Sequence, residues 1–249
     1  MTKVKPAFAA MLLAASIAVP AYAKDAKEKT PYVHYLSDAQ IAADVDLLPP
    51  PTPMGSAEDI ADREVTERTY LARNAVDAAL AAKEESFDAF AFAAVLGPGF
   101  DKNKLPRTAA LFNDAKKILA DAKNVGKAKW KRERPCPANS CQWDPEKDAV
   151  DWKNRDYGYP SGHSTRATAF ALLLDAMFPA RKPQLDAFGQ QAGWRRVIRG
   201  VHTPQDIYAG RVLGQAVARD LLANAEFRKQ LADAAGELRS AGFKDAVAP

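Results

Sequence analysis

The spacing of apolar residues constrains the fold of this 249-residue chain more than any other feature. From Ser56 onward, Ala, Leu and Phe recur at intervals of three and four residues, which is the period of an amphipathic helix. Leu111, Phe112, Ile118 and Leu119 form one such series. Few segments alternate as strands do, and clusters of Val, Ile and Thr are scarce. The sequence therefore predicts one all-α domain.

Helix boundaries follow from caps and breakers. Ser56 followed by Asp59 is typical of a capped start, and the Gly-Pro-Gly run at residues 97–99 ends a stretch that we expect to form two helices. Further helices are expected at residues 106–131, 161–178, 184–199, 204–224 and 226–240. The charged, Trp- and Pro-containing residues 136–159 are expected to form a long loop, and the proline run at residues 48–53 an extended strap.

Residues 1–23 have the features of a secretory signal peptide. Lys3 and Lys5 precede a short apolar segment, and Ala21 and Ala23 are small residues at the positions that a signal peptidase reads. The alternative is a membrane anchor, but the apolar segment is shorter than the roughly 20 residues that span a bilayer. We therefore expect periplasmic export, cleavage after Ala23, a mature domain of residues 24–249 and no stable membrane anchor.

The net charge argues against nucleic acid as a partner. The formal charge of +4 falls to +2 once Lys3 and Lys5 leave with the signal peptide. A nucleic-acid-binding domain is expected to carry a larger basic excess.

The two cysteines, Cys136 and Cys141, are expected to form a disulfide. A close, even pair in an exported chain is typical of a disulfide. The alternative is a metal site, but two thiols this close, with only three histidines in the chain, make a poor zinc site. No metal site is predicted.

The first of three candidate features is a basic segment ending in Arg134 and Pro135. Lys127 and Arg134 are seven residues apart, which is two helical turns, so both can face the same way. Pro135 discourages Arg134 from continuing the helix. We expect two cations at a helix end, aimed at a common point. Taken alone, a basic solvated face that complements the helix dipole is the better interpretation.

The second feature is the run Pro160-Ser161-Gly162-His163. Proline and a small residue before an apolar stretch mark a helix N-terminus, where free N–H groups can bind an anion. Gly162 lets the backbone approach a ligand closely, Ser161 offers a hydroxyl, and His163 can give or take a proton. A capped helix start with an exposed histidine is the open alternative.

The third feature comprises Arg196, His202 and Asp206. Asp206 falls in the first turn of a helix predicted to begin near Pro204, four residues after His202. Its carboxylate can accept the Nδ1–H of the imidazole, which leaves Nε2 free as a nucleophile. Arg196 can present two N–H groups to phosphate oxygens. The alternative is a histidine capped by Asp206 near a charged helix end.

Together the three features predict phosphoryl transfer without a metal. Two of the three histidines in the chain lie in them, and the third, His34, has no identifiable partner. Cations and backbone amides would neutralise the phosphoryl oxygens. One histidine would attack phosphorus while the other protonates the leaving oxygen.

The pattern Lys-x6-Arg-Pro, Pro-Ser-Gly-His and Arg-x5-His-x3-Asp resembles the signature of the type 2 phosphatidic acid phosphatase superfamily. Within it, the chain is most similar to the bacterial class A non-specific acid phosphatases, over most of residues 40–240. This resemblance implies an all-α bundle with the active site in its core, small phosphate monoesters as substrates, no cofactor, and a homodimer in many members.

The resemblance also implies roles. His202 would form a phosphohistidine, Asp206 would orient it, and His163 would act first as general acid and then as base. The phosphate oxygens would be held by Lys127, Arg134, Ser161, Gly162 and Arg196.

Three departures from the family pattern leave the substrate preference open. Arg195 stands where the family usually has Ser, and it either alters the rim of the site or points outward. Thr203-Pro204-Gln205 replaces a Trp-containing run. Cys136 stands where an apolar residue is common, and its disulfide would stiffen the phosphate-binding loop.

Two other functions are compatible with the motifs. One is a vanadium-dependent haloperoxidase, because vanadate mimics the phosphoryl transition state and the same site can bind either group. If the chain is a phosphatase, phosphate and vanadate are expected to inhibit it. The other is a non-catalytic phosphate-binding helical protein, which needs neither a nucleophile nor an acid. The small size of the chain favours the phosphatase, and the sequence does not identify its physiological substrate.

Overall fold

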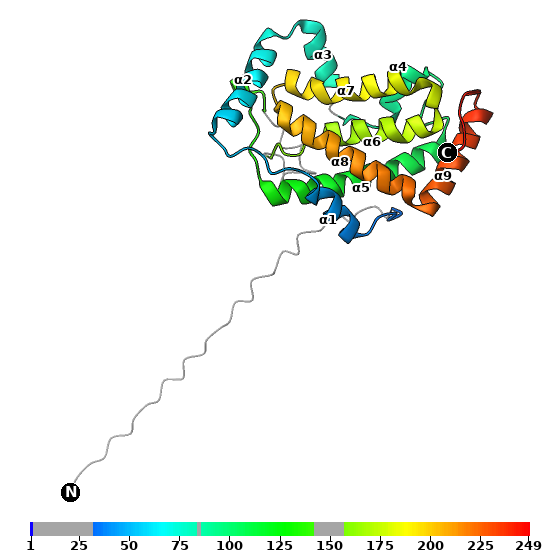
Figure 1. Ribbon diagram of the computed structural model, residues 1–249, viewed down its shortest axis with the longest axis horizontal. Helices are drawn as coiled ribbons and strands as arrows, with labels where there is room; N and C mark the ends of the chain where they lie inside the picture. Colours follow the sequence, from blue (N-terminus) through cyan, green and yellow to red (C-terminus); the bar gives the residue numbers. More distant parts are fainter. Residues whose placement is uncertain (2–31, 84–85, 142–156) are drawn as a thin grey trace. The chain divides into compact units, whose positions relative to one another are not determined.

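Figure 1 shows the computed structural model, which describes residues 1, 32–83, 86–141 and 157–249. The predicted signal peptide and residues 142–156 of the predicted loop lie outside the described residues. Tyr32–Pro249 form one compact unit. Among the helices described, none combines the length and the hydropathy that crossing a bilayer requires.

The prediction of an all-α fold is confirmed. In the described part of the chain, the only regular structure besides helices is an isolated antiparallel bridge between Glu133 and Tyr157. The elements are α1 (Asp38–Asp46), α2 (Ala57–Ala72), α3 (Ala75–Lys83), η2 (Ala89–Phe92), α4 (Ala93–Leu96), α5 (Pro106–Trp130), η3 (Pro137–Asn139), α6 (Gly162–Met177), η4 (Pro179–Arg181), α7 (Lys182–Ile198), α8 (Pro204–Ala223) and α9 (Ala225–Ser240).

The central helix of the bundle is α6, which packs against α5, α7 and α8 (Figure 1). Most residues of α6 are buried, and Phe170, Leu173 and Leu174 are fully so. Because the links from α6 to α7 and from α7 to α8 are short, the start of α6, the end of α7 and the start of α8 meet at one end of the bundle.

Two glycines of α8 allow it to approach α6 closely. A Cβ atom on Gly210 would lie 2.5 Å from the carbonyl oxygen of Ser161, and one on Gly214 would lie 2.5 Å from that of Thr165. Both distances are too short for van der Waals contact, so these positions require glycine. The close packing lets the Ser161 amide donate to the carbonyl oxygen of Asp206 at 3.0 Å.

The predicted helix boundaries are largely confirmed, with two differences at the N-terminal side. The Ser56 hydroxyl accepts from the Asp59 amide at 3.2 Å, as the predicted cap requires. The expectation of two helices up to residue 96 is wrong, because Asn74 caps a new helix and Asp88 caps η2. Helix α1 was not predicted from the sequence, although Ser37 begins it with a capping box.

Candidate active site

His202 lies in the turn before α8 and is only 2% exposed. Its Nδ1 is 3.3 Å from Oδ2 of Asp206, as the spacing of four residues predicted. Asp206 is fully buried and forms a capping box with Thr203. The Thr203 amide donates to the same Oδ2 at 3.0 Å, and the Asp206 amide donates to the Thr203 hydroxyl at 3.3 Å. The helix cap therefore orients the carboxylate toward the imidazole.

Arg134 contacts the other nitrogen of the imidazole. Its Nη1 is 3.0 Å from Nε2 of His202, and it also donates to the carbonyl oxygen of Val201 at 2.7 Å. Because a guanidinium can only donate, Nε2 accepts in this contact and the ring proton belongs on Nδ1, facing Asp206. This is the tautomer that a nucleophilic Nε2 requires.

Lys127 and Arg134 approach the same imidazole, but not through helical spacing. Lys127 is buried in the last turn of α5, which ends at Trp130. Lys131 then adopts left-handed backbone, with φ 49° and ψ 31°, and Arg134 lies beyond it. The expectation that two helical turns align the two side chains is therefore wrong. The turn at Lys131 carries Arg134 to His202 instead.

Arg196 is buried in the last turn of α7, at 4% exposure. Burial lowers the pKa of His202 well below its ordinary value of 6.5, and the positive charges of Arg134, Lys127 and Arg196 lower it further. All three cations predicted to hold phosphate are thus close enough to act on the imidazole. Together they favour its neutral form, which is the nucleophilic one.

Ser161 and His163 begin α6, as predicted. Ser161 is fully buried at the N-cap, where its hydroxyl accepts from the Ser164 amide at 3.4 Å. His163 is half-buried in the first turn, with Nδ1 at 3.5 Å from Nη2 of Arg166. The alternative of an exposed histidine is not what the structure has.

Lys123 is a further cation at this helix start, which the sequence analysis missed. A Cβ atom on Gly162 would lie 2.5 Å from Cδ of Lys123, so the lysine stem covers the glycine. Lys123 is buried and lies one turn before Lys127 on α5. Their spacing of four residues was the available signal, since it places both on one helix face.

Comparison with known proteins identifies the family of this chain. A family model described as the PAP2 superfamily matches residues 115–229. This range contains every site residue predicted from the sequence. A non-specific acid phosphatase of Providencia stuartii is 30% identical over 212 residues, which are 83% of this chain and 85% of that protein. This chain belongs to the bacterial acid phosphatases of the PAP2 superfamily. It is a phosphoric monoester hydrolase, as the motifs predicted.

Two further relatives of this phosphatase have the same kind of name. An acid phosphatase of Zymomonas mobilis is 28% identical over 232 residues, which are 91% of this chain and 84% of that protein. A non-specific acid phosphatase of Salmonella typhi is 38% identical over 84 residues, which are 34% of each chain.

In this phosphatase, the buried Arg132 joins Asp206 to α2. Its Nη1 donates to Oδ1 of Asp206 at 2.9 Å and to the Thr203 hydroxyl at 2.8 Å. Its Nη2 donates to Asp59 at 2.8 Å and to Asp62 at 3.0 Å. In the sequence, Arg132 is one of several basic residues in the segment that ends at Pro135, and no role was predicted for it. No local signal identifies its partners, because each of them lies 70 or more positions away in the sequence.

The Thr203-Pro204-Gln205 run of the phosphatase has a structural role. Thr203 caps α8, and Pro204 occupies its first position. Oε1 of Gln205 accepts from the amide and hydroxyl of Thr52 at 3.1 and 3.2 Å, and the Gln205 amide donates to Asp62 at 3.1 Å. This departure from the family pattern therefore attaches the proline strap and α2 to the start of α8.

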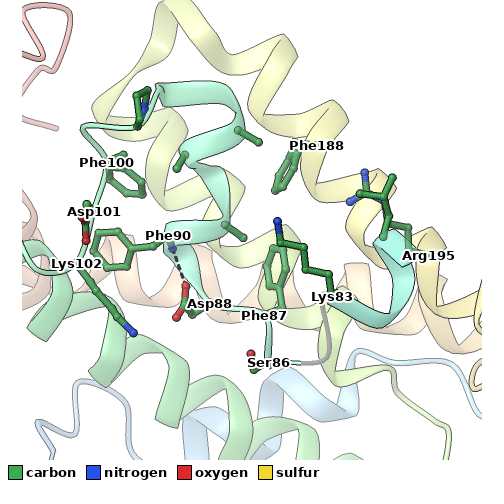
Figure 2. A pocket seen from close by; sticks show the side chains of 15 residues that line it. Lys83, Ser86, Phe87, Asp88, Phe90, Phe100, Asp101, Lys102, Phe188 and Arg195 are labelled. Atoms are coloured by element: carbon green, nitrogen blue, oxygen red, sulfur yellow. Dashed lines mark hydrogen bonds between the residues drawn. The ribbon is translucent and has the colours of Figure 1, made fainter. Parts of the chain in front are cut away.

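Arg195 lies on a different face of α7 from Arg196, because adjacent helical residues diverge by about 100°. Figure 2 shows Arg195 at the edge of a cavity of about 730 Å³. Its guanidinium carbon is 5.8 Å from the centre of the Phe188 ring. None of the described residues that line this cavity is a predicted site residue. The geometry supports the interpretation that Arg195 points away from the phosphate.

Cys136 and Cys141 form the predicted disulfide, with an S–S distance of 2.02 Å. The turn that it closes follows Arg134 and is also attached to the α7–α8 link, because the Ser140 hydroxyl donates to the Gly200 carbonyl at 2.9 Å. Within the described ranges, no three His, Cys, Asp or Glu side chains gather as they would around a metal ion. Metal independence stays a prediction.

Proposed function

We propose that this phosphatase is exported to the periplasm and hydrolyses phosphate monoesters through a phosphohistidine on His202, without a metal ion. One observation carries the mechanism: the buried imidazole is held between Asp206 at Nδ1 and Arg134 at Nε2. A histidine with only a structural role would not need its Nε2 to face a guanidinium that can bind phosphate oxygens. The names of the relatives support the reaction class.

In the first step, Nε2 of His202 forms a bond to phosphorus as the bond from phosphorus to the ester oxygen breaks. His163 gives its proton to that oxygen, so a neutral alcohol leaves. In the second step, His163 removes a proton from water, the water oxygen bonds to phosphorus, and the N–P bond breaks. Inorganic phosphate and neutral His202 result. Arg134 would exchange its contact with Nε2 for a phosphate oxygen when substrate binds.

During both steps, the negative charge on the phosphoryl oxygens needs neutralising groups. The residues proposed to supply them are Lys127, Arg134 and Arg196 with their charges, Ser161 with its hydroxyl, and Gly162 with its backbone amide. Inorganic phosphate and vanadate should bind the same groups and act as competitive inhibitors.

The mechanism is tested by trapping the intermediate. Enzyme mixed with a 32P-labelled monoester and quenched in alkaline denaturant should yield a labelled protein that survives alkali and loses its label in acid. Peptide mapping should place the label on His202, and prior treatment with EDTA should leave the yield unchanged. Absence of label in an enzyme that turns over, or label on another residue, would contradict the proposal; loss of activity after EDTA would contradict metal independence.

The pH dependence of kcat/KM should be bell-shaped, with its acid limb well below pH 6.5. His202 must be neutral to attack, and burial with the surrounding cations lowers its pKa, so it stays neutral in acid. Replacing Arg196 by methionine removes one of these cations. The pKa of His202 should then rise, and the acid limb should move to higher pH. Initial rates between pH 3.5 and 9 measure both profiles.

The matched control for this prediction is Arg195→Met. It removes the same charge from the adjacent position, whose side chain lies on another face of α7. Its acid limb should stay where the unmodified enzyme has it. An equal shift in both variants would assign the effect to overall charge, and a flat profile between pH 4 and 9 would contradict the paired-histidine mechanism.

A further inference from the structure

Helix α2 lies outside the family match at residues 115–229. It nevertheless contacts the backbone of both His202 and Arg134, the two residues that meet at Nε2 of the imidazole. The Thr66 hydroxyl lies 3.4 Å from the carbonyl oxygen of His202 and 3.2 Å from that of Asp62, so its one proton is shared between the two acceptors. Arg63 donates to the carbonyl oxygen of Arg134 at 3.2 Å. The two residues that meet at Nε2 are therefore both attached to the same helix.

Arg132 extends this attachment to the catalytic carboxylate. It is 6% exposed and spans the space between Asp206 and the two α2 carboxylates of Asp59 and Asp62. Burial alone would lower the pKa of Arg132, but the three carboxylates raise it, so the guanidinium stays charged. Burial raises the pKa of Asp206, and the charge of Arg132 is the largest influence that opposes this rise.

Gly158 packs closely against the carboxylate of Asp206. A Cβ atom on Gly158 would lie 2.6 Å from Oδ2 of Asp206. The Gly158 amide donates to the carbonyl oxygen of Arg132 at 2.7 Å, so the same arginine also holds this segment in place. Arg132 at Oδ1 and the Thr203 amide at Oδ2 together hold the carboxylate in the orientation that faces His202.

We propose that Arg132 is a positioning residue, which fixes the Asp206 carboxylate against His202 and is itself held by Asp59 and Asp62 of α2. The proposal rests on the proposed function of His202 and Asp206. Arg132 acts through Asp206 and does not touch the substrate. An element outside the family match thereby becomes part of the catalytic apparatus.

The first test combines Arg132→Met with Asp206→Asn. Arg132→Met should lower kcat for 4-nitrophenyl phosphate by about 100-fold, with a much smaller change in KM, because the phosphate-binding groups remain. Since Arg132 acts through Asp206, the double variant should be no slower than Asp206→Asn alone, within about twofold. Effects that multiply in the double variant would overturn the proposal.

The second test is the pH profile. Without Arg132, Asp206 should take up a proton at higher pH, so the acid limb of kcat/KM should move toward neutral pH. The groups that face this pair from the surrounding elements are Asp59, Asp62, Arg63, Arg134, Tyr159 and His202. Compared with Arg132→Met, Arg132→Lys should have a higher rate and a smaller shift of the acid limb. Lysine keeps the charge but cannot reach all four oxygen partners at once.

Two further variants, Asp62→Asn and Arg219→Met, distinguish an effect on the position of Asp206 from an effect on the stability of the fold. Asp62 is at the edge of the network, at 13% exposure, so its variant should fold and show an intermediate loss of rate. Arg219 pairs with the buried Asp44 away from the active site, so its loss should lower Tm without moving the pH profile. If Arg132→Met does not fold, Asp62→Asn decides: a normal rate and profile would overturn the proposal.

The trapping experiment distinguishes failure of this proposal from failure of the proposed function. Labelled His202 in the unmodified enzyme, together with a normal rate and profile in folded Arg132→Met, overturns the positioning role alone. Absence of phosphohistidine in the active, unmodified enzyme overturns the proposed function, on which the positioning role rests.

Discussion

Replacing His202 by alanine should lower kcat for 4-nitrophenyl phosphate by at least about a thousandfold. The substitution removes the nitrogen that would bond to phosphorus. Lys127 and Arg196 remain, so substrate binding should suffer much less than turnover. Initial rates give kcat and KM, and a thermal unfolding curve shows whether the variant is folded.

The matched control is His34→Ala. His34 is exposed on the N-terminal segment, and its ring lies 4.1 Å from that of Tyr32. Its loss should leave both kcat and KM unchanged. If His202→Ala retained the activity of the unmodified enzyme, the assignment of the nucleophile would be wrong.

Replacing Gly210 by alanine should destabilise the protein by about 2 kcal/mol or more. The new methyl group would lie 2.5 Å from the carbonyl oxygen of Ser161 and 2.8 Å from Cβ of Ser164, so α6 and α8 must move apart. This loss should exceed the gain of about 1 kcal/mol that alanine brings to a helix interior. Because Ser161 begins α6 at the phosphate site, activity should fall as well. Urea unfolding measures the change.

Gly236→Ala provides the control for the same substitution in a helix without the close approach. On α9, the nearest atom to a Cβ at Gly236 is Nη2 of Arg239 at 3.8 Å. This variant should gain about 0.5–1 kcal/mol and keep full activity. Equal stability changes in the two variants would mean that the α6–α8 contact does not require glycine.

The parts of the site that could be predicted from the sequence are those within one helical turn. Asp206 reaches Nδ1 of His202 because four residues at a helix start bring the two side chains together. The start of α6 at Gly162 was predicted for the same reason, since proline and small residues before an apolar run favour a helix N-terminus. These relations depend on backbone geometry alone.

Predictions from local sequence were wrong where a turn interrupts a helix or where an element is short. Helical spacing does not align Lys127 with Arg134, because the helix ends before Arg134 and the left-handed residue Lys131 redirects the chain toward His202. The stretch up to residue 96 divides into more elements than predicted, because Asn74 and Asp88 begin new ones. Side-chain caps of this kind compete with continued helix, and apolar spacing does not report them.

The sequence by itself determined the helical class, the three phosphate motifs and the pairing of His202 with Asp206, because periodicity and short-range spacing control these directly. Only the tertiary structure decided that Arg134 meets Nε2, that Arg132 joins Asp206 to Asp59 and Asp62, and that the pKa of His202 falls. Contacts between distant segments, and the burial that shifts a pKa, depend on how whole helices pack, which no local pattern encodes.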